Sequence, residues 1–115
     1  MKVAVSATGD SPDTQMHRLF GRCDWFLIFD DESEEVKAWK NPYAEMETGA
    51  GIGCAQDLIQ EGIEAVISGQ VGPKAYEVLR QAKIGIYLAP PDFTVQKVYE
   101  MFLTKKLHKM EIKTF

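Results

Sequence analysis

One short segment holds most of the side chains that could carry chemistry. In Phe20-Gly21-Arg22-Cys23, a guanidinium with a fixed fork of donors stands beside a thiol, and a neighbouring cation of this kind would lower the pKa of the thiol. His17 lies six residues before Cys23 and could supply an imidazole ligand, and Met16 adds a thioether. Cys23 and His17 are therefore candidate metal ligands. The alternative is that Phe20 fills the core, Arg22 pairs with an acid, and Cys23 is a small buried apolar residue.

The second cysteine, Cys54, is a third candidate metal ligand. It is predicted in the first turn of a helix, where the helix dipole favours a thiolate, but it also flanks the apolar stripe of that helix, so packing explains it equally well. The two cysteines share no CxxC spacing of the metal-binding kind. In a reducing compartment both should be thiols, available to a soft metal if the fold brings them together.

Two glycine-bearing segments could form a site from backbone groups. Gly49-Ala50-Gly51-Ile52-Gly53 precedes a predicted helix, so its N–H groups would suit an anion or the sulfide and carboxylate groups of a cluster. It is not a P-loop, because no Gly-Lys-Ser/Thr follows, nor a dinucleotide fingerprint, because it follows a long loop rather than a strand. Gly69 and Gly72 lie in a second such segment, Ser68 to Pro73. Close packing of a helix on the sheet is the alternative explanation for the first segment.

Enzymatic chemistry finds little support in the sequence. A nuclease of the ribonuclease H type needs clustered carboxylates, including one on the first strand, and Lys2 to Ala7 contains none. The two histidines, His17 and His108, suggest no Ser–His–Asp arrangement, and no paired acids flank the segments described above. We therefore expect a protein that is not an enzyme.

Apolar periodicity places these residues on alternating strands and helices. Turn residues and helix-start and helix-stop signals mark the boundaries, among them Pro73 at the start of one helix and Gly62 at the end of another. Strands are predicted at residues 3–7, 25–29, 36–40, 64–68 and 84–88, and helices at residues 52–61, 73–82 and 95–103. The strand at 25–29 is almost wholly apolar and should be buried on both faces, whereas 36–40 alternates as an edge strand does.

The charged runs and the tail are predicted to lie at the surface. Asp30 to Glu35 contains five acids in six residues and predicts a solvated hairpin turn rather than a metal site. Lys105, Lys106 and Lys109 predict the solvated end of the last helix. The apolar stripes of the last two helices run as far as Ala82 and Leu103. The tail from Met110 to Phe115 alternates weakly and receives no assignment.

The order of these elements predicts the fold. Three strands joined by a loop and a hairpin are followed by strands joined through helices, and right-handed crossovers then require a parallel portion beside the antiparallel hairpin. We expect an α/β domain over residues 1–115, with a three-layer ribonuclease H-like motif and a mixed five-stranded sheet flanked by helices. In such a sheet, ligands bind beyond the carboxyl ends of the parallel strands. Residues 8–23, 49–54 and 69–73 are predicted to meet there.

Composition excludes several classes of partner. The formal net charge of −4 repels phosphate backbones, so nucleic acid is not an expected partner. No apolar run approaches the length of a membrane span, and the N-terminus lacks a secretory pattern. We therefore expect a cytoplasmic protein without a membrane partner.

Several motifs together resemble the dinitrogenase iron–molybdenum cofactor biosynthesis family, over residues 1 to about 105. The motifs are Met-Lys-Val-Ala-Val at residues 1–5, Phe20-Gly21-Arg22-Cys23, Asn41-Pro42, Gly49-Ala50-Gly51-Ile52, the run from Ser68 to Leu79, and the strand from Ile84 to Leu88. The resemblance implies a ribonuclease H-like fold without nuclease activity. The family often has a histidine directly before Phe-Gly-Arg, where this chain has Leu19, so Cys23 becomes the better ligand candidate.

The resemblance also implies a function: binding or carrying the iron–molybdenum cofactor, one of its precursors or another metal–sulfur cluster, with a cluster-donor or cluster-acceptor protein as partner. The expected cofactor-binding residues are Phe20, Gly21, Arg22, Cys23, Gly49, Ala50, Gly51, Gly69 and Gly72, and the expected metal ligands are Cys23, His17 and Cys54. A metal-free interaction or regulatory module that docks through the same loops is the main alternative. A small enzyme acting on a phosphorylated metabolite at residues 49–53 is the third.

Overall fold

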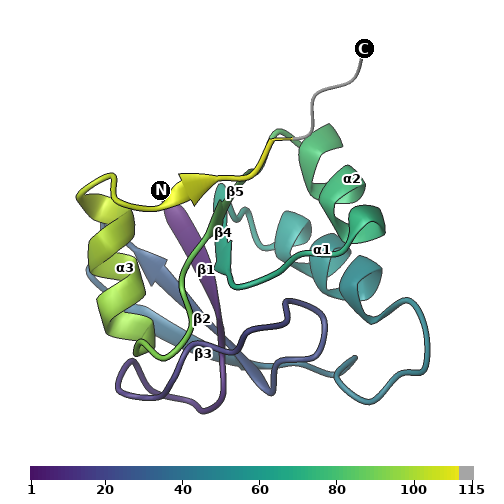
Figure 1. Cartoon of the computed structure of the whole chain (residues 1–115), viewed down its shortest axis with the longest axis horizontal. Coiled ribbons are helices and arrows are strands. Elements are labelled where there is room, and N and C mark those ends of the chain that lie inside the picture. The colour runs from purple at the N-terminus through teal and green to yellow at the C-terminus, as the bar shows by residue number, and fades with distance from the viewer. Residues whose placement is uncertain (112–115) are drawn as a thin grey trace.

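The computed structural model describes residues 1–111, and residues 112–115 of the unassigned tail lie outside the described residues. Six strands form one sheet in the order β3-β2-β1-β4-β5-β6, with three helices packed against it (Figure 1). The elements are β1 (Lys2–Ala7), β2 (Trp25–Asp30), β3 (Val36–Lys40), α1 (Ala50–Gln60), β4 (Ala65–Ser68), α2 (Pro73–Gln81), β5 (Gly85–Leu88), α3 (Val95–Leu103) and β6 (His108–Lys109).

The predicted mixed sheet is confirmed. β1 pairs with β4 and β4 with β5 in parallel, whereas β2 runs antiparallel to both β1 and β3. The predicted count of five strands is wrong, because β6 adds a sixth, antiparallel to β5. A strand of two residues is too short to show a period-2 pattern in the sequence. The lysine cluster is therefore not a helix end: α3 ends at Leu103, Lys105 adopts a left-handed conformation with φ of 60°, and Lys109 lies in β6.

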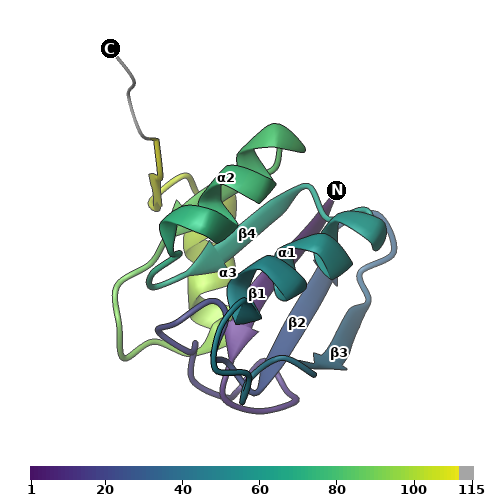
Figure 2. The ribbon, with the colours of Figure 1, turned by 90° about the vertical axis from the view of Figure 1, so that its right-hand side faces the viewer.

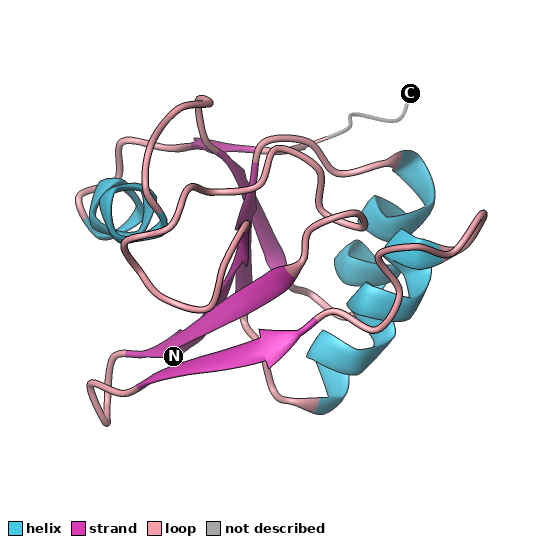
Figure 3. Cartoon of the chain, turned by 90° about the horizontal axis from the view of Figure 1, so that it is seen from below, coloured by secondary structure: helices cyan, strands magenta, loops and turns pink. Residues whose placement is uncertain are grey.

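Helices cover the two faces of the sheet unequally: α1 and α2 pack on one face and α3 on the other (Figures 2 and 3). Successive side chains of a strand point to opposite faces, so Phe26 and Ile28 pack towards α1 and α2, while Leu27 and Phe29 pack towards α3. The apolar composition of β2 follows from this double burial. β3, by contrast, is the exposed edge strand that its alternation predicts.

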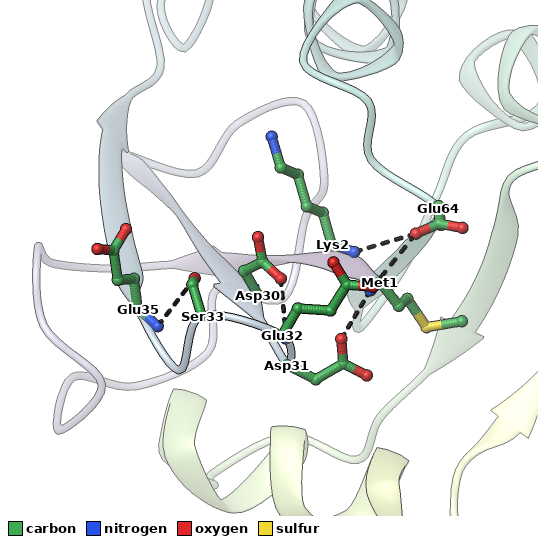
Figure 4. Close-up of polar contacts among 8 residues, drawn as sticks. All are labelled: Met1, Lys2, Asp30, Asp31, Glu32, Ser33, Glu35 and Glu64. Atoms are coloured by element: carbon green, nitrogen blue, oxygen red, sulfur yellow. Dashed lines mark hydrogen bonds and ion pairs between the residues drawn. The ribbon is translucent and has the colours of Figure 1, made fainter.

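The acidic run forms the solvated hairpin between β2 and β3. Residues 31–35 are exposed, and polar contacts lie within the turn and between the turn and the N-terminus (Figure 4). The Asp30 carboxylate accepts from the Glu32 N–H at 3.0 Å, and the Asp31 carboxylate accepts from the amino group of Met1 at 2.6 Å. The hydrogen bond that this amino group donates to Asp31 raises its pKa. The turn is thus explained by solvation and local bonding.

The loop after β1 divides between the two faces. Its first part meets the start of α3, where the Val95 N–H donates to the Thr14 carbonyl at 2.8 Å. Its last part crosses the carboxyl ends of β1 and β4, where the Ser6 hydroxyl donates to the His17 carbonyl at 2.7 Å and hydrogen-bonds the Ser68 hydroxyl at 2.8 Å. Because both serines are fully buried, this pair fixes the backbone of His17 beside the parallel strands.

No helix within residues 1–111 has the length and apolar character needed to cross a membrane.

Two leucine-to-alanine substitutions should distinguish a leucine that is buried in the core from one that the sequence places on an apolar stripe but that is exposed. Leu79 of α2 is 0% exposed, whereas Leu103 is the last residue of α3 and is 54% exposed; Ala82, just after α2, is also exposed. Leu79→Ala should lower the free energy of unfolding by about 2–5 kcal/mol, and Leu103→Ala should change it by less than about 0.5 kcal/mol. Urea denaturation measures both, and equal losses would contradict the packing described.

Candidate functional site

The end of the first loop and the first turns of α1 and α2 surround one hollow of about 410 Å³. The hollow lies at the carboxyl ends of the parallel strands, as expected for a sheet of this kind. Seven residues predicted from the sequence line it: Phe20, Gly21, Arg22, Gly49, Ala50, Gly51 and Gly72. Gly69, Cys23, Cys54 and His17 do not line it. Residues 8–18 do not line it either, so the predicted contribution of the first loop shrinks to residues 19–22.

Backbone contacts fix the loop at the edge of the hollow. The Phe20 N–H donates to the Gln70 carbonyl at 3.0 Å, and Leu19 and Gln70 form an isolated parallel bridge. Gly69 is needed beside this bridge, because a Cβ there would lie 2.8 Å from the carbonyl oxygen of Arg18. The loop thus runs beside the end of β4 as a short additional strand would.

Several glycines allow close approach between the elements. A Cβ on Gly21 would lie 2.7 Å from the backbone nitrogen of Gly51, so the loop backbone rests directly on the first turn of α1. A Cβ on Gly51 would in turn lie 3.1 Å from the Cβ of Ala75 in α2, and a Cβ on Gly53 would lie 2.7 Å from the ring of Tyr43. These two glycines are thus explained by close packing, but against a helix and a loop, so the predicted packing of the helix on the sheet is not what they provide.

The electrostatics of the hollow favour an anion. No side chain caps the N-terminus of α1 or α2, so the first-turn N–H groups of both helices lack intrahelical and side-chain partners and carry partial positive charge. The charged side chains among the lining residues are Arg22 and Lys74, and no carboxylate or imidazole lines the hollow. In a chain with a net charge of −4, this is a local region of positive potential.

Arg22 does not act on Cys23 as the sequence suggested. Its guanidinium donates to the carbonyl oxygens of Ala44 at 3.2 Å and Glu47 at 3.1 Å, and also to that of Met46. These bonds tie the loop before α1 to the rim of the hollow. The expectation that the guanidinium lowers the thiol pKa is wrong, because burial instead raises the pKa of Cys23.

Both cysteines lie beneath the hollow as protonated thiols. Each is 0% exposed, and burial also raises the pKa of Cys54 to about 12. Cys54 is the fifth residue of α1 rather than a first-turn residue, so it lies beyond the uncapped N–H groups that would stabilise a thiolate. The thiol of Cys23 donates to the Phe20 carbonyl at 3.3 Å, and that of Cys54 donates to the Asn41 side-chain oxygen at 3.2 Å.

His17 does not join the cysteines. Its Nδ1 accepts from the Leu19 N–H at 3.0 Å, and its backbone bonds Ser6. With Nδ1 occupied as an acceptor, a neutral imidazole carries its proton on Nε2, so neither nitrogen offers a free lone pair. Within residues 1–111, no three His, Cys, Asp or Glu side chains are grouped so as to hold a metal ion. Met16 lies in the core on the α3 side of the sheet.

Sequence reasoning missed three contributors to this region. Lys74 lines the hollow directly after Pro73 at the start of α2, a position that could have been recognised from the helix-start signal. Asn41, noted only as part of Asn41-Pro42, is buried beneath the loop. The Ser6–Ser68 pair has no local signal, because its members come from strands 62 residues apart.

Comparisons with known proteins support a common fold and family. The sequence model of the family described as dinitrogenase iron-molybdenum cofactor matches residues 1–105. An uncharacterized protein of Methanocaldococcus jannaschii is 34% identical over 95 residues, which cover 80% of each chain.

Two solved structures resemble the whole chain. The apo form of the orange protein from Desulfovibrio gigas superposes with a TM-score of 0.90 at 29% identity, covering 95% of this chain and 92% of that one. A Thermotoga protein described as NifB and as a member of the DUF35 family superposes with a TM-score of 0.86 at 29% identity, covering 99% and 97%.

Two glycine substitutions should distinguish the crowded wall of the hollow from its open one. Gly21→Ala forces a methyl group against the backbone of α1 and should lower the free energy of unfolding by about 1–3 kcal/mol. Gly72→Ala adds a methyl group in open space at φ of −67°, so the poorer N-cap and the stiffer unfolded chain should offset each other to within about 0.5 kcal/mol. Thermal or urea unfolding gives both values, and a larger loss at Gly72 would contradict the placement of these walls.

The buried thiols should resist modification in the native protein. Because burial raises both pKa values and the thiolate is the reactive form, a thiol reagent such as Ellman's reagent should not label Cys23 or Cys54 at pH 8. In denaturant it should label both. Rapid labelling of the folded protein at this pH would show that the thiols are accessible and ionised.

Proposed function

This chain belongs to the dinitrogenase iron-molybdenum cofactor family, and on that premise we propose that it binds or carries an anionic metal–sulfur cluster, or a precursor of the iron–molybdenum cofactor, without catalysing a reaction. A cluster-donor or cluster-acceptor protein is its expected partner. The observation that carries the proposal is the meeting of two uncapped helix N-termini around one hollow without a carboxylate. The ribonuclease H-like classification of the fold stays a prediction.

The donor set of the hollow fits an anion better than a bare metal ion. Metal ligation by cysteine needs thiolates, and both thiols are buried and protonated beneath the hollow. The first-turn N–H groups, the Lys74 ammonium and the Arg22 guanidinium are all donors. Such groups would hold the sulfide or oxide surface of a cluster through charge-assisted hydrogen bonds. The cluster would then be held as a releasable cargo rather than through metal–protein bonds.

The lining residues include no carboxylate, imidazole or thiol, and this composition supports a role in binding. General acid–base catalysis needs a side chain whose pKa lies near the working pH, and the lining residues include no His, Asp, Glu or Cys. Lys74 is exposed at the start of α2, where its side chain can reach a bound anion. We therefore assign the lining residues to binding and orientation.

The proposal predicts that charge, and not thiol ligation, sets affinity. Under anaerobic conditions, tetrathiomolybdate should bind the wild-type protein with an affinity that falls as ionic strength rises. Lys74→Gln should weaken binding about two- to fivefold, the effect of one partly exposed charge at a helix N-terminus. Lys97→Gln removes an equivalent charge from α3, on the opposite face of the sheet, and should leave affinity unchanged. Absorption spectra during titration report binding.

Cysteine and histidine variants decide between this mode and metal ligation. Binding that is unchanged in Cys23→Ala, Cys54→Ser and His17→Ala removes the three residues as ligands; serine is chosen at position 54 because its hydroxyl can still donate to the Asn41 side chain. Binding that is lost in the cysteine variants and insensitive to Lys74→Gln would replace the present proposal with thiolate ligation. A wild-type protein that takes up no cluster at all would favour the alternative of a metal-free docking module.

A further inference from the structure

Asn41, the first residue after β3, has a buried side chain that bonds several separate segments. It is 5% exposed. Its amide nitrogen donates to the carbonyl oxygens of Cys23 at 2.8 Å and Gly21 at 3.2 Å. Its oxygen accepts from the Tyr43 N–H at 2.9 Å and from the Cys54 thiol at 3.2 Å. Both donors and both lone pairs of the amide are thus in use.

These bonds join the two walls of the hollow. Gly21 belongs to the loop that forms one wall, and Cys54 belongs to α1, whose first turn forms the other. The walls touch where Gly21 lies over Gly51. The amide of this one side chain therefore hydrogen-bonds both the loop, through Gly21 and Cys23, and the helix, through Cys54. A change in its length or donor set must move one wall relative to the other.

The rest of the loop cannot supply this restraint. Phe20 is tied to Gln70 on the side of the parallel strands, and Arg22 is tied to the exposed loop at residues 44–47. Neither bond reaches α1. Asn41 meets Gly21, the residue between these two anchors, from below. Buried, fully satisfied polar networks of this kind specify one geometry, because any other arrangement leaves a buried group unpaired.

We propose that Asn41 is the positioning residue of the hollow. It does not line the hollow. It sets the separation of the loop from α1 through Gly21 and Cys54, and thereby the place of the backbone N–H groups that would meet an anion. The nature of the ligand rests on the function proposed above, whereas the positioning of the two walls does not.

The direct test replaces Asn41 by aspartate, which has the same shape but lacks both donors, with tetrathiomolybdate as the probe. Asn41→Asp should bind the probe at least tenfold more weakly than wild type. The amide chemical shifts of Gly21 and Gly51 should move, because the bond to the Gly21 carbonyl is lost. Asn41→Ser, which adds no charge, provides the same two readouts if the aspartate variant does not fold.

Tyr43→Phe is the matched control. It removes the hydrogen bond from the Tyr43 hydroxyl to Asp57 at 2.8 Å, which also ties this segment to α1, but it leaves every contact of Asn41 in place. It should lose stability while keeping wild-type affinity to within about twofold. A merely structural role for Asn41 predicts instead that affinity follows stability in all variants.

The two proposals fail in distinguishable ways. If the wild-type protein does not bind the probe, the proposed function is contradicted, and the shifts of Gly21 and Gly51 alone judge the positioning role. Shifts that move in the Asn41 variants and not in Tyr43→Phe support it. Folded Asn41 variants with unmoved Gly21 and Gly51 signals would overturn it, whatever the affinity.

Discussion

The backbone of residues 20–22 rests on the first turn of α1 at a separation that leaves no room for a side chain between them. A Cβ on Gly21 would lie 2.7 Å from the nitrogen of Gly51. This contact directs the Phe20 side chain into the core, where its ring packs edge-on against that of Phe26 with the ring centroids 5.3 Å apart. Arg22 stays at the surface. The contact also brings Cys23 beneath the loop. The walls of the hollow and the burial of the thiols both follow from this one approach.

The same geometry separates two kinds of chemistry that the sequence had placed together. Backbone N–H groups and the side chains of Arg22 and Lys74 face the hollow, whereas the thiols lie below it in an apolar cluster. A cluster held by backbone N–H groups and a lysine can be released without breaking metal–protein bonds. Binding of this kind suits a protein that passes its cargo on, because exchange then needs only competition for hydrogen bonds.

The sequence predicted the fold well where patterns are long. The apolar strand segments, the apolar stripes of the helices and the crossover rule together predicted the mixed sheet and the helices on it. β6 was missed because a strand of two residues is too short to show a period-2 pattern. Leu103 was predicted to be part of the buried face of α3 but is exposed, because an apolar stripe on a helix does not show how far the sheet extends beneath it. The site was predicted as three convergent segments, since the carboxyl ends of parallel strands meet at one edge. The direction of the Arg22 guanidinium and the state of the thiols could not be predicted, because both depend on contacts between segments far apart in sequence.

In the function proposed here, the hollow holds a metal–sulfur cluster without bonds from Cys23, Cys54 or His17. The most direct measurement is the metal and sulfide content of protein purified without oxygen, together with its visible spectrum, before and after passage through high salt. We expect metal and sulfide that accompany the protein at low ionic strength and leave it at high ionic strength while the fold stays intact. Protein that remains free of metal and sulfide, both as purified and after reconstitution, would contradict this account.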